Sequence, residues 1–225
     1  GAAGGRLARL AQNFNAAGIG LFFKLLGSDQ QLAVPHIAVP HISSLNWGAL
    51  AKAGFKGVVL DKDNTLTKPF EMEVDDRVAA SLREACTAFG DKGLVLLSNS
   101  AGLEQYDPHG EEAAALEKAL GVAVLRHREK KPSGGKGEVE AHFGCEAQQL
   151  IMVGDRYLTD VVFGNRHGML TVRPTPLVLG GEPTGVVVAR KTEEFFVGRW
   201  TAGGVTAPAH PLVPDGDYTR FVKQD

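Results

Sequence analysis

Five short runs of aliphatic residues constrain the fold of this chain more than any other feature of its sequence. They occupy residues 58–60, 94–97, 122–125, 151–153 and 170–172. None alternates with polar residues, which is typical of strands that are covered on both faces. The segments between them, around 75–89, 110–120, 134–143 and 158–166, have the apolar spacing of helices. This alternation predicts an α/β fold, a Rossmann-like parallel sheet with helices on both faces.

The composition excludes several classes of protein. The 24 Lys and Arg residues nearly balance the 26 Asp and Glu residues, so the chain lacks the basic excess of nucleic-acid-binding proteins, and we expect no nucleic-acid partner. No apolar run reaches the roughly 18 residues that a transmembrane helix requires. The two cysteines, Cys86 and Cys145, are far apart and are expected to be free thiols in a reducing compartment.

The sequence divides into three regions, 1–53, 54–200 and 201–225. The first is amphipathic over residues 6–26, where apolar residues at helical spacing are flanked by Arg6, Arg9 and Lys24. This pattern predicts a helix at a membrane interface, and the alternative is that its apolar stripe packs on the α/β domain or on a second copy. Two prolines forbid a continuous helix over 34–47, which we expect to be an extended connector. Region 54–200 holds the α/β domain, and region 201–225 is expected to be an irregular tail.

Polar side chains directly follow three of the predicted strands. Asp61 and Asp63 come after the first strand, Ser98 after the second and Asp155 after the fourth. Ligands of open parallel sheets bind at the carboxyl ends of the strands, so these groups mark a site. Carboxylates beside a buried strand need a neutralising cation, and hard oxygen ligands favour Mg²⁺ over zinc. Ser98 and Lys131 would suit the remaining oxygens of a phosphoryl group, which indicates phosphoryl transfer.

Four motifs carry a resemblance to a known family. DKDNTLT (61–67), Ser98, KKP (130–132) and GDRYLTD (154–160) are similar, in this order, to the motifs of the haloacid dehalogenase superfamily. The runs FKGVVLDKDNTLT, LLSNSAGL, LRHREKKP and HFGC further resemble the phosphatidylglycerophosphate phosphatases of organelles, above all the plant-type members. The resemblance covers roughly residues 34–175 and implies a haloacid dehalogenase fold with its phosphatase domain over 54–200. About 30 residues separate successive motifs, too few for a cap domain.

The resemblance implies a role for each aspartate of the first and last motifs. Asp61 would be the nucleophile that forms an aspartyl-phosphate, and Asp63 would be the general acid and later the general base. Mg²⁺ would be held by the side chains of Asp61 and Asp155 and by the main-chain carbonyl of Asp63.

It also implies roles for residues of the second and third motifs. Ser98 would bind a phosphoryl oxygen, and Lys131 would offset the charge of nucleophile and phosphate. Asp160 would lie behind the metal and orient Lys131 or a water molecule, and Asn99 would shape the loop of the substrate-binding site. Lys130 is a rival for the role of Lys131.

Basic residues near the third and fourth motifs are candidates for substrate recognition. A phospholipid of this class carries a second phosphate, the internal diester, which favours an additional cation near the site. The candidates are Arg126, Arg128, Lys130 and Arg156. The alternative is that these charges form a solvated face.

The resemblance and the residues together predict a Mg²⁺-dependent phosphatase that converts phosphatidylglycerophosphate to phosphatidylglycerol, on the way to cardiolipin. Its partner would be a phospholipid at a membrane surface, to which the protein binds peripherally. We expect it at a plastid membrane, or alternatively at the matrix side of the mitochondrial inner membrane. One alternative is a capless phosphatase of a soluble phosphomonoester or a phosphoprotein. Another is a catalytically silent module that binds lipid or phosphate.

Overall fold

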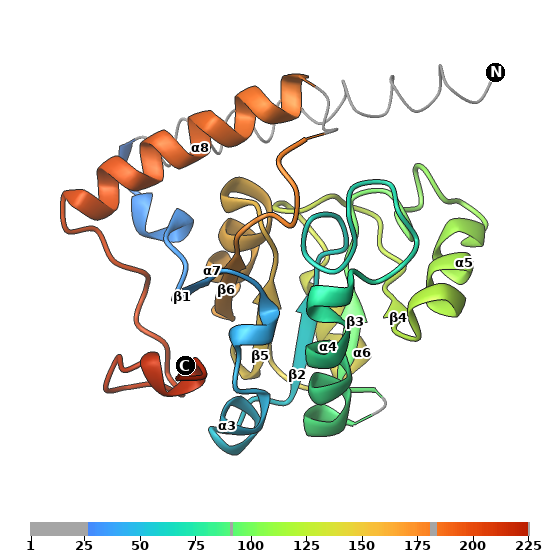
Figure 1. The fold of residues 1–225 in the computed structure, drawn as a ribbon, viewed down its shortest axis with the longest axis horizontal. Helices are drawn as coiled ribbons and strands as arrows, with labels where there is room; N and C mark the ends of the chain where they lie inside the picture. The colour runs from blue at the N-terminus through green and yellow to red at the C-terminus, as the bar shows by residue number, and fades with distance from the viewer. Residues whose placement is uncertain (1–26, 91, 181–183, 225) are drawn as a thin grey trace.

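A six-stranded parallel sheet forms the centre of the protein (Figure 1). The computed structural model describes residues 27–90, 92–180 and 184–224. The strands are β1 (Ile37–Val39), β2 (Gly57–Leu60), β3 (Leu94–Leu96), β4 (Ala123–Val124), β5 (Leu150–Val153) and β6 (Leu170–Pro174). Their order in the sheet is β1-β6-β5-β2-β3-β4, and every neighbouring pair is parallel. The predicted parallel α/β architecture is therefore confirmed.

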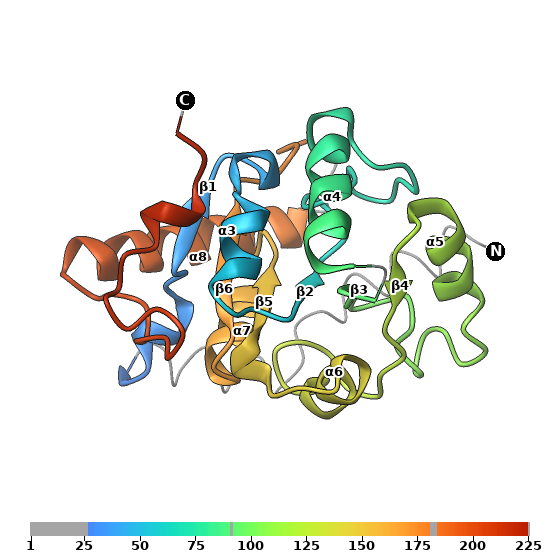
Figure 2. The ribbon, with the colours of Figure 1, turned by 90° about the horizontal axis from the view of Figure 1, so that it is seen from below.

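Helices cover both faces of this sheet. They are α3 (Trp47–Lys52), α4 (Asp76–Phe89), α5 (Glu111–Leu120), α6 (Lys136–Phe143), α7 (Val162–Arg166) and α8 (Thr184–Ala202). Short helical turns are η1 (Gln30–Ala33), η2 (Ile42–Ser44), η3 (Ala147–Gln149), η4 (Tyr157–Val161) and η5 (Thr219–Phe221). Figure 2 shows α3 and α4 on one face of the sheet and α6 and α7 on the other.

The two-sided burial explains why the strands lack polar alternation. Successive residues of β2 point to opposite faces, so Val58 and Leu60 join the core cluster that includes α3 and α4, while Val59 joins the cluster that includes α6 and α7. All four residues of β2 are buried, as are all four of β5 beside it. These two central strands consequently present their carboxyl ends from a fixed position in the middle of the sheet.

Part of the segment predicted as a connector joins the sheet. Residues 37–39 are extended, as expected, but they pair with β6 as the edge strand β1, with Ile37 opposite Val172. Pro35 and Pro40 flank this strand, and an edge strand tolerates proline because one side of it forms no ladder. The α/β core thus includes residues that precede position 54.

The predicted interfacial helix over residues 6–26 lies outside the described residues. The tail is predicted over 201–225, but α8 extends to Ala202, and in the described remainder η5 is the one helical turn, while Val213 and Phe221 are buried in the core cluster that contains Trp47. Within the described ranges, no helix combines the length and the apolar character that crossing a membrane would take.

Asn165 fastens the segment before β1 to the rest of the fold. Its Nδ2 atom donates to the main-chain oxygens of Leu32 at 2.9 Å and Val34 at 2.8 Å, and its Oδ1 atom accepts a hydrogen bond from Thr171 at 3.0 Å. The side chain is buried, so each of these partners would lose its hydrogen bond without access to bulk water if the amide were removed.

We predict that Asn165→Ala lowers the free energy of unfolding by about 2–3 kcal/mol, because several buried polar groups lose their partner. Urea unfolding followed by circular dichroism would measure the loss. Gln148→Ala is the matched control, since Gln148 is exposed and its side chain donates to Glu146, two residues away, which is also exposed. Equal stability of the two variants would contradict the structural role of Asn165.

Candidate active site

Three aspartates meet where the central strands end. Asp61 follows β2 and Asp155 follows β5 after one glycine, and because the strands pair with Leu60 opposite Val153, these carboxylates emerge side by side. The main-chain nitrogen of Asp61 donates to the oxygen of Val153 at 2.8 Å. One carboxylate oxygen each from Asp61, Asp155 and Asp160 lies within 4.8 Å of the other two. The structure thus brings together three of the four aspartates that the sequence singled out, and leaves Asp63 outside the cluster.

Lys131 is buried between two of these carboxylates. Its Nζ atom lies 2.7 Å from Oδ1 of Asp61 and 2.6 Å from Oδ1 of Asp160, and its side chain is 1% exposed. Burial alone would lower the pKa of Lys131, but Asp160 and Asp61 raise it above its ordinary value, so the ammonium group stays charged. Burial raises the pKa of Asp61 to about 6, although Lys131 lowers it.

A π-helical turn places Asp160. Within η4 the main-chain nitrogen of Asp160 donates to the oxygen of Arg156 at 3.1 Å, and its Oδ2 accepts from the nitrogen of Arg156 at 3.2 Å. A Cβ atom at Gly154 would lie 2.3 Å from Cγ of Asp160, so glycine is required there for the close approach. The predicted orienting contact from Asp160 to Lys131 is present as geometry, and its catalytic value stays a prediction.

Asp63 is not part of the carboxylate cluster and is partly exposed to solvent. Its side chain is 43% exposed, forms an ion pair with Lys62, and accepts a hydrogen bond from the main-chain nitrogen of Phe70 at 3.0 Å. Such a carboxylate can exchange protons with a leaving group or with water at the rim. Its predicted acid–base role and the ligand role of its carbonyl both remain predictions.

The loop after β3 contacts the main chain of Lys131. Ser98 is buried, and its Oγ lies 3.2 Å from the nitrogen of Ser100. Asn99 accepts a hydrogen bond from the main-chain nitrogen of Lys131 at 2.8 Å, so it positions the backbone of the third motif. A ring nitrogen of His127 lies 2.8 Å from the main-chain oxygen of Ser98, a link that sequence reasoning did not single out.

Each of the four predicted substrate-binding cations has a partner on the protein. Arg126 pairs with Glu117 at 2.6 Å, Lys130 donates to the hydroxyl of Tyr106 at 2.8 Å, and Arg156 pairs with Glu193. Arg128 is the most exposed of the four, with a side chain 84% exposed and 3.4 Å from Glu104. Their contact with a substrate phosphate stays a prediction.

Sequence reasoning missed Arg190. This arginine of α8 is buried, and its Nη1 atom lies 2.7 Å from Oδ2 of Asp155. Burial raises the pKa of Asp155 to about 7, while Arg190 lowers it. The sequence around position 190 contains no signal for a site, because the contact depends entirely on how α8 packs.

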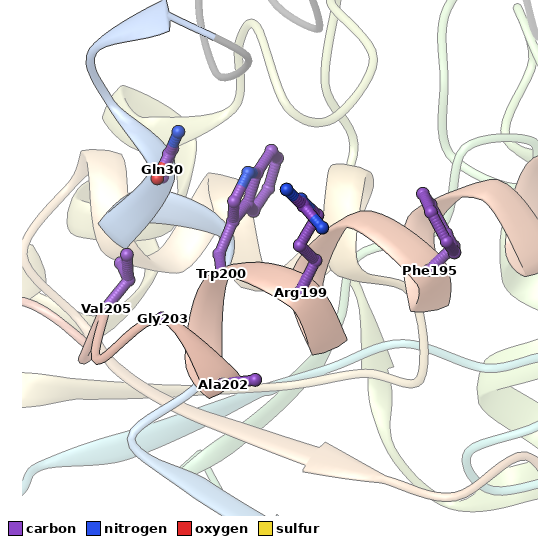
Figure 3. A pocket seen from close by; sticks show the side chains of 7 residues that line it. All are labelled: Gln30, Phe195, Arg199, Trp200, Ala202, Gly203 and Val205. Atoms are coloured by element: carbon purple, nitrogen blue, oxygen red, sulfur yellow. The ribbon is translucent and has the colours of Figure 1, made fainter.

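A surface hollow at the other end of α8 is separate from this chemistry. Figure 3 shows its lining, Gln30, Phe195, Arg199, Trp200, Ala202, Gly203 and Val205. None of these residues is acidic, so the hollow offers no carboxylate ligands. The chemistry therefore belongs to the carboxyl edge of the sheet.

The carboxylate cluster suits a divalent cation. All three donors are carboxylate oxygens, two of the three aspartates are at most 2% exposed, and the three carboxylates outnumber the two cations that pair with them, Lys131 and Arg190. Hard oxygen ligands of this kind bind hard cations in preference to zinc or copper. The residues present fit a metal site.

A parallel sheet with clustered carboxylates and a buried lysine at its carboxyl edge is the arrangement expected of the phosphatases that the four motifs resemble. The model of the family described as mitochondrial PGP phosphatase matches residues 17–177, more than half of the chain. The chain belongs to this family.

Named relatives agree with this assignment. The chain is 61% identical over 217 residues to phosphatidylglycerophosphate phosphatase 1, chloroplastic, of Chlamydomonas reinhardtii, covering 96% of this chain and 80% of that protein. It is 44% identical to the chloroplastic/mitochondrial enzyme of Arabidopsis thaliana, again over 96% of this chain but only 61% of that protein's length. The probable mitochondrial phosphatidylglycerophosphatase of Schizosaccharomyces pombe is 30% identical over 68% of this chain and 79% of its own.

We predict that Lys131→Met abolishes turnover and lowers the free energy of unfolding by about 3–5 kcal/mol, because two buried carboxylates lose their counter-ion. Burial raises the pKa of Asp61 to about 6 while Lys131 lowers it, so the loss of Lys131 raises this pKa further, and protonation at low pH removes one of the unpaired charges. The destabilisation should therefore be smaller at pH 5 than at pH 8, as measured by urea unfolding at both values.

The control is Lys136→Met, which removes an exposed lysine 3.6 Å from Glu140 and should change stability by about 0.5 kcal/mol or less. A pH-independent loss in Lys131→Met, or a loss no greater than that of the control, would contradict the interpretation.

Proposed function

We propose that this protein is a Mg²⁺-dependent phosphatase that hydrolyses phosphatidylglycerophosphate to phosphatidylglycerol and phosphate. The observation that carries the proposal is the contact of buried Lys131 with both Asp61 and Asp160, at the edge of the sheet where Asp155 completes a carboxylate cluster. Membership of the PGP phosphatase family supports the choice of substrate. The product would enter phosphatidylglycerol and cardiolipin synthesis.

The chain's own groups divide the reaction between them. A carboxylate oxygen of Asp61 attacks phosphorus, the bond to the glycerol oxygen breaks, and Asp63 protonates that oxygen as it leaves. Asp63, now ionised, takes a proton from water as the water oxygen attacks the aspartyl-phosphate. Inorganic phosphate leaves and the carboxylate of Asp61 is restored. Lys131 stays charged throughout and offsets negative charge at the phosphoryl oxygens, with Ser98 as a further donor.

The metal would be held by Asp61 and Asp155 together with the main-chain carbonyl of Asp63, and Asp160 lies close enough to contribute directly or through water. When bound, Mg²⁺ would offset the repulsion between the substrate phosphate and the aspartates. Oxygen-only donors and their burial support magnesium over softer metals.

Exposed apolar side chains lie on two segments next to this site. Phe70, Met72 and Leu179 are 54%, 40% and 71% exposed. Their segments adjoin the first motif. The main-chain nitrogen of Phe70 donates to Asp63, and that of Val178, which precedes Leu179, donates to Asn64, at 3.0 Å each. Single exposed apolar residues are ordinary, but a group of them around one site suits a partner with an apolar surface.

Among the described residues, no separate lid is inserted beside the site. The segments between β2 and α4 and between β3 and α5, both fully described, contain turns and bends but no further helix or strand. An open site with an apolar rim supports a substrate that remains in a bilayer during the reaction. We propose a peripheral position on a plastid membrane, with the mitochondrial inner membrane as the alternative, in line with the organellar names of the relatives.

We predict that phosphate release from phosphatidylglycerophosphate requires Mg²⁺, stops with a chelator and is abolished in Asp61→Asn, because the attacking oxygen lacks its charge. Malachite-green detection of phosphate would follow the reaction. Asp76→Asn removes an exposed carboxylate in the first turn of α4 and should retain activity.

Faster turnover of sugar phosphates, nucleotides or a phosphoprotein than of the lipid would favour the soluble-substrate alternative. No hydrolysis of any phosphomonoester would favour the silent binding module. Turnover in Asp61→Asn comparable to the wild type would refute the nucleophile assignment.

We predict that the double variant Met72→Ser, Leu179→Ser hydrolyses p-nitrophenyl phosphate normally but loses activity on the lipid in vesicles, about tenfold, because two apolar contacts with the bilayer are removed. Gln148→Ser, at an exposed position, is the control. An equal loss on both substrates would show that the rim acts through the site and not through the membrane.

A further inference from the structure

The inner face of α8 carries charged residues where apolar ones are expected. Its four buried residues, Arg190, Glu193, Val197 and Trp200, are spaced three or four apart and therefore lie on one face. Arg190 and Glu193 are 5% and 2% exposed. Long charged side chains are almost never fully buried unless they are paired, so their partners indicate what this face does.

Those partners are consecutive residues of the fourth motif. Arg190 pairs with Asp155, and Glu193 pairs with Arg156, whose Nε atom lies 3.3 Å from Oε2 of Glu193. The helix and the loop each contribute one arginine and one acid, so Arg190 of the helix pairs with Asp155 of the loop, and Glu193 of the helix pairs with Arg156 of the loop. This arrangement fixes both the position of α8 along the loop and its rotation about its own axis.

A third contact holds the backbone of the same residue. Nε of Arg173, in β6, donates to the main-chain oxygen of Asp155 at 3.1 Å, and Nη2 of Arg173 lies 3.5 Å from Glu194 of α8. The guanidinium also lies 4.1 Å from the ring centre of Tyr157. Asp155 is thus held at its side chain by Arg190, a residue of α8, and at its carbonyl by Arg173, which α8 contacts through Glu194.

We infer that Arg190 is a positioning residue that orients Asp155 for the metal, which makes α8 part of the metal centre. The inference rests on the proposed metal-dependent function. The ion pair uses one oxygen of Asp155, Oδ2, and a carboxylate has a second oxygen to offer a cation. Residues that pair with a metal ligand from behind fix its orientation, and their loss commonly weakens metal affinity 10–100-fold. The family model ends at residue 177, before α8 begins, so this support comes from outside the matched segment.

The test is the dissociation constant of Mg²⁺ for the whole protein, measured by isothermal titration calorimetry without substrate. We expect Arg190→Gln to bind Mg²⁺ roughly 10–100-fold more weakly than the wild type. Lys191→Gln makes the same change of charge at the neighbouring exposed position and should stay within about twofold, because an exposed charge is screened. Urea unfolding of each variant separates a loss of stability from a loss of metal binding.

Unchanged or tighter Mg²⁺ binding in Arg190→Gln would overturn the inference, since it would mean that the arginine is neutral toward the metal or competes with it. If that variant does not fold, Arg190→Lys decides: a shorter reach and the loss of the planar guanidinium should still weaken Mg²⁺ binding, and wild-type affinity would overturn the inference.

Absence of Mg²⁺ binding by the wild type would refute the proposed metal-dependent function and the inference together. Equal binding by wild type and variant would refute the inference alone.

Discussion

The ammonium group of Lys131, enclosed by the carboxylates of Asp61 and Asp160, is the interaction on which the rest of the site depends. Without a cation at this point, the ends of the two central strands would bring buried negative charges together with no compensation. Such a cluster does not favour folding, because apolar side chains of similar size would be about as stable or more so. The presence of this charged cluster at the ends of the central strands therefore indicates a catalytic role rather than structural support.

Much of the sheet and part of the site could be predicted from the sequence, for identifiable physical reasons. Strands covered on both faces show as unbroken aliphatic runs, and the aspartates that end them lie close together because β2 and β5 pair in register. The strand β1 was missed because it has only three residues and is bordered by two prolines. Its pairing with β6 depends on contacts between distant parts of the chain.

The helix α8 was missed for a different reason. Hydrophobic periodicity detects a helix by an apolar stripe, and here the stripe is interrupted by Arg190 and Glu193, which are buried as ion pairs. Nothing local to position 190 distinguishes an arginine that reaches a catalytic loop from one in solvent. What distinguishes Arg190 and Glu193 is their pairing with Asp155 and Arg156, which precede them by more than 30 residues. Long-range electrostatic pairing of this kind is invisible to any analysis of a single sequence window.

The position of α8 in the chain has a consequence for the order in which the protein becomes complete. All six strands and the aspartates that follow them precede residue 184, where α8 begins. A ribosome releases the chain from its N-terminal end, and structure forms as the chain emerges. The nascent protein therefore exposes its carboxylates before Arg190, which pairs with Asp155, has left the exit tunnel. The ion pairs around these carboxylates are complete only after α8 has emerged.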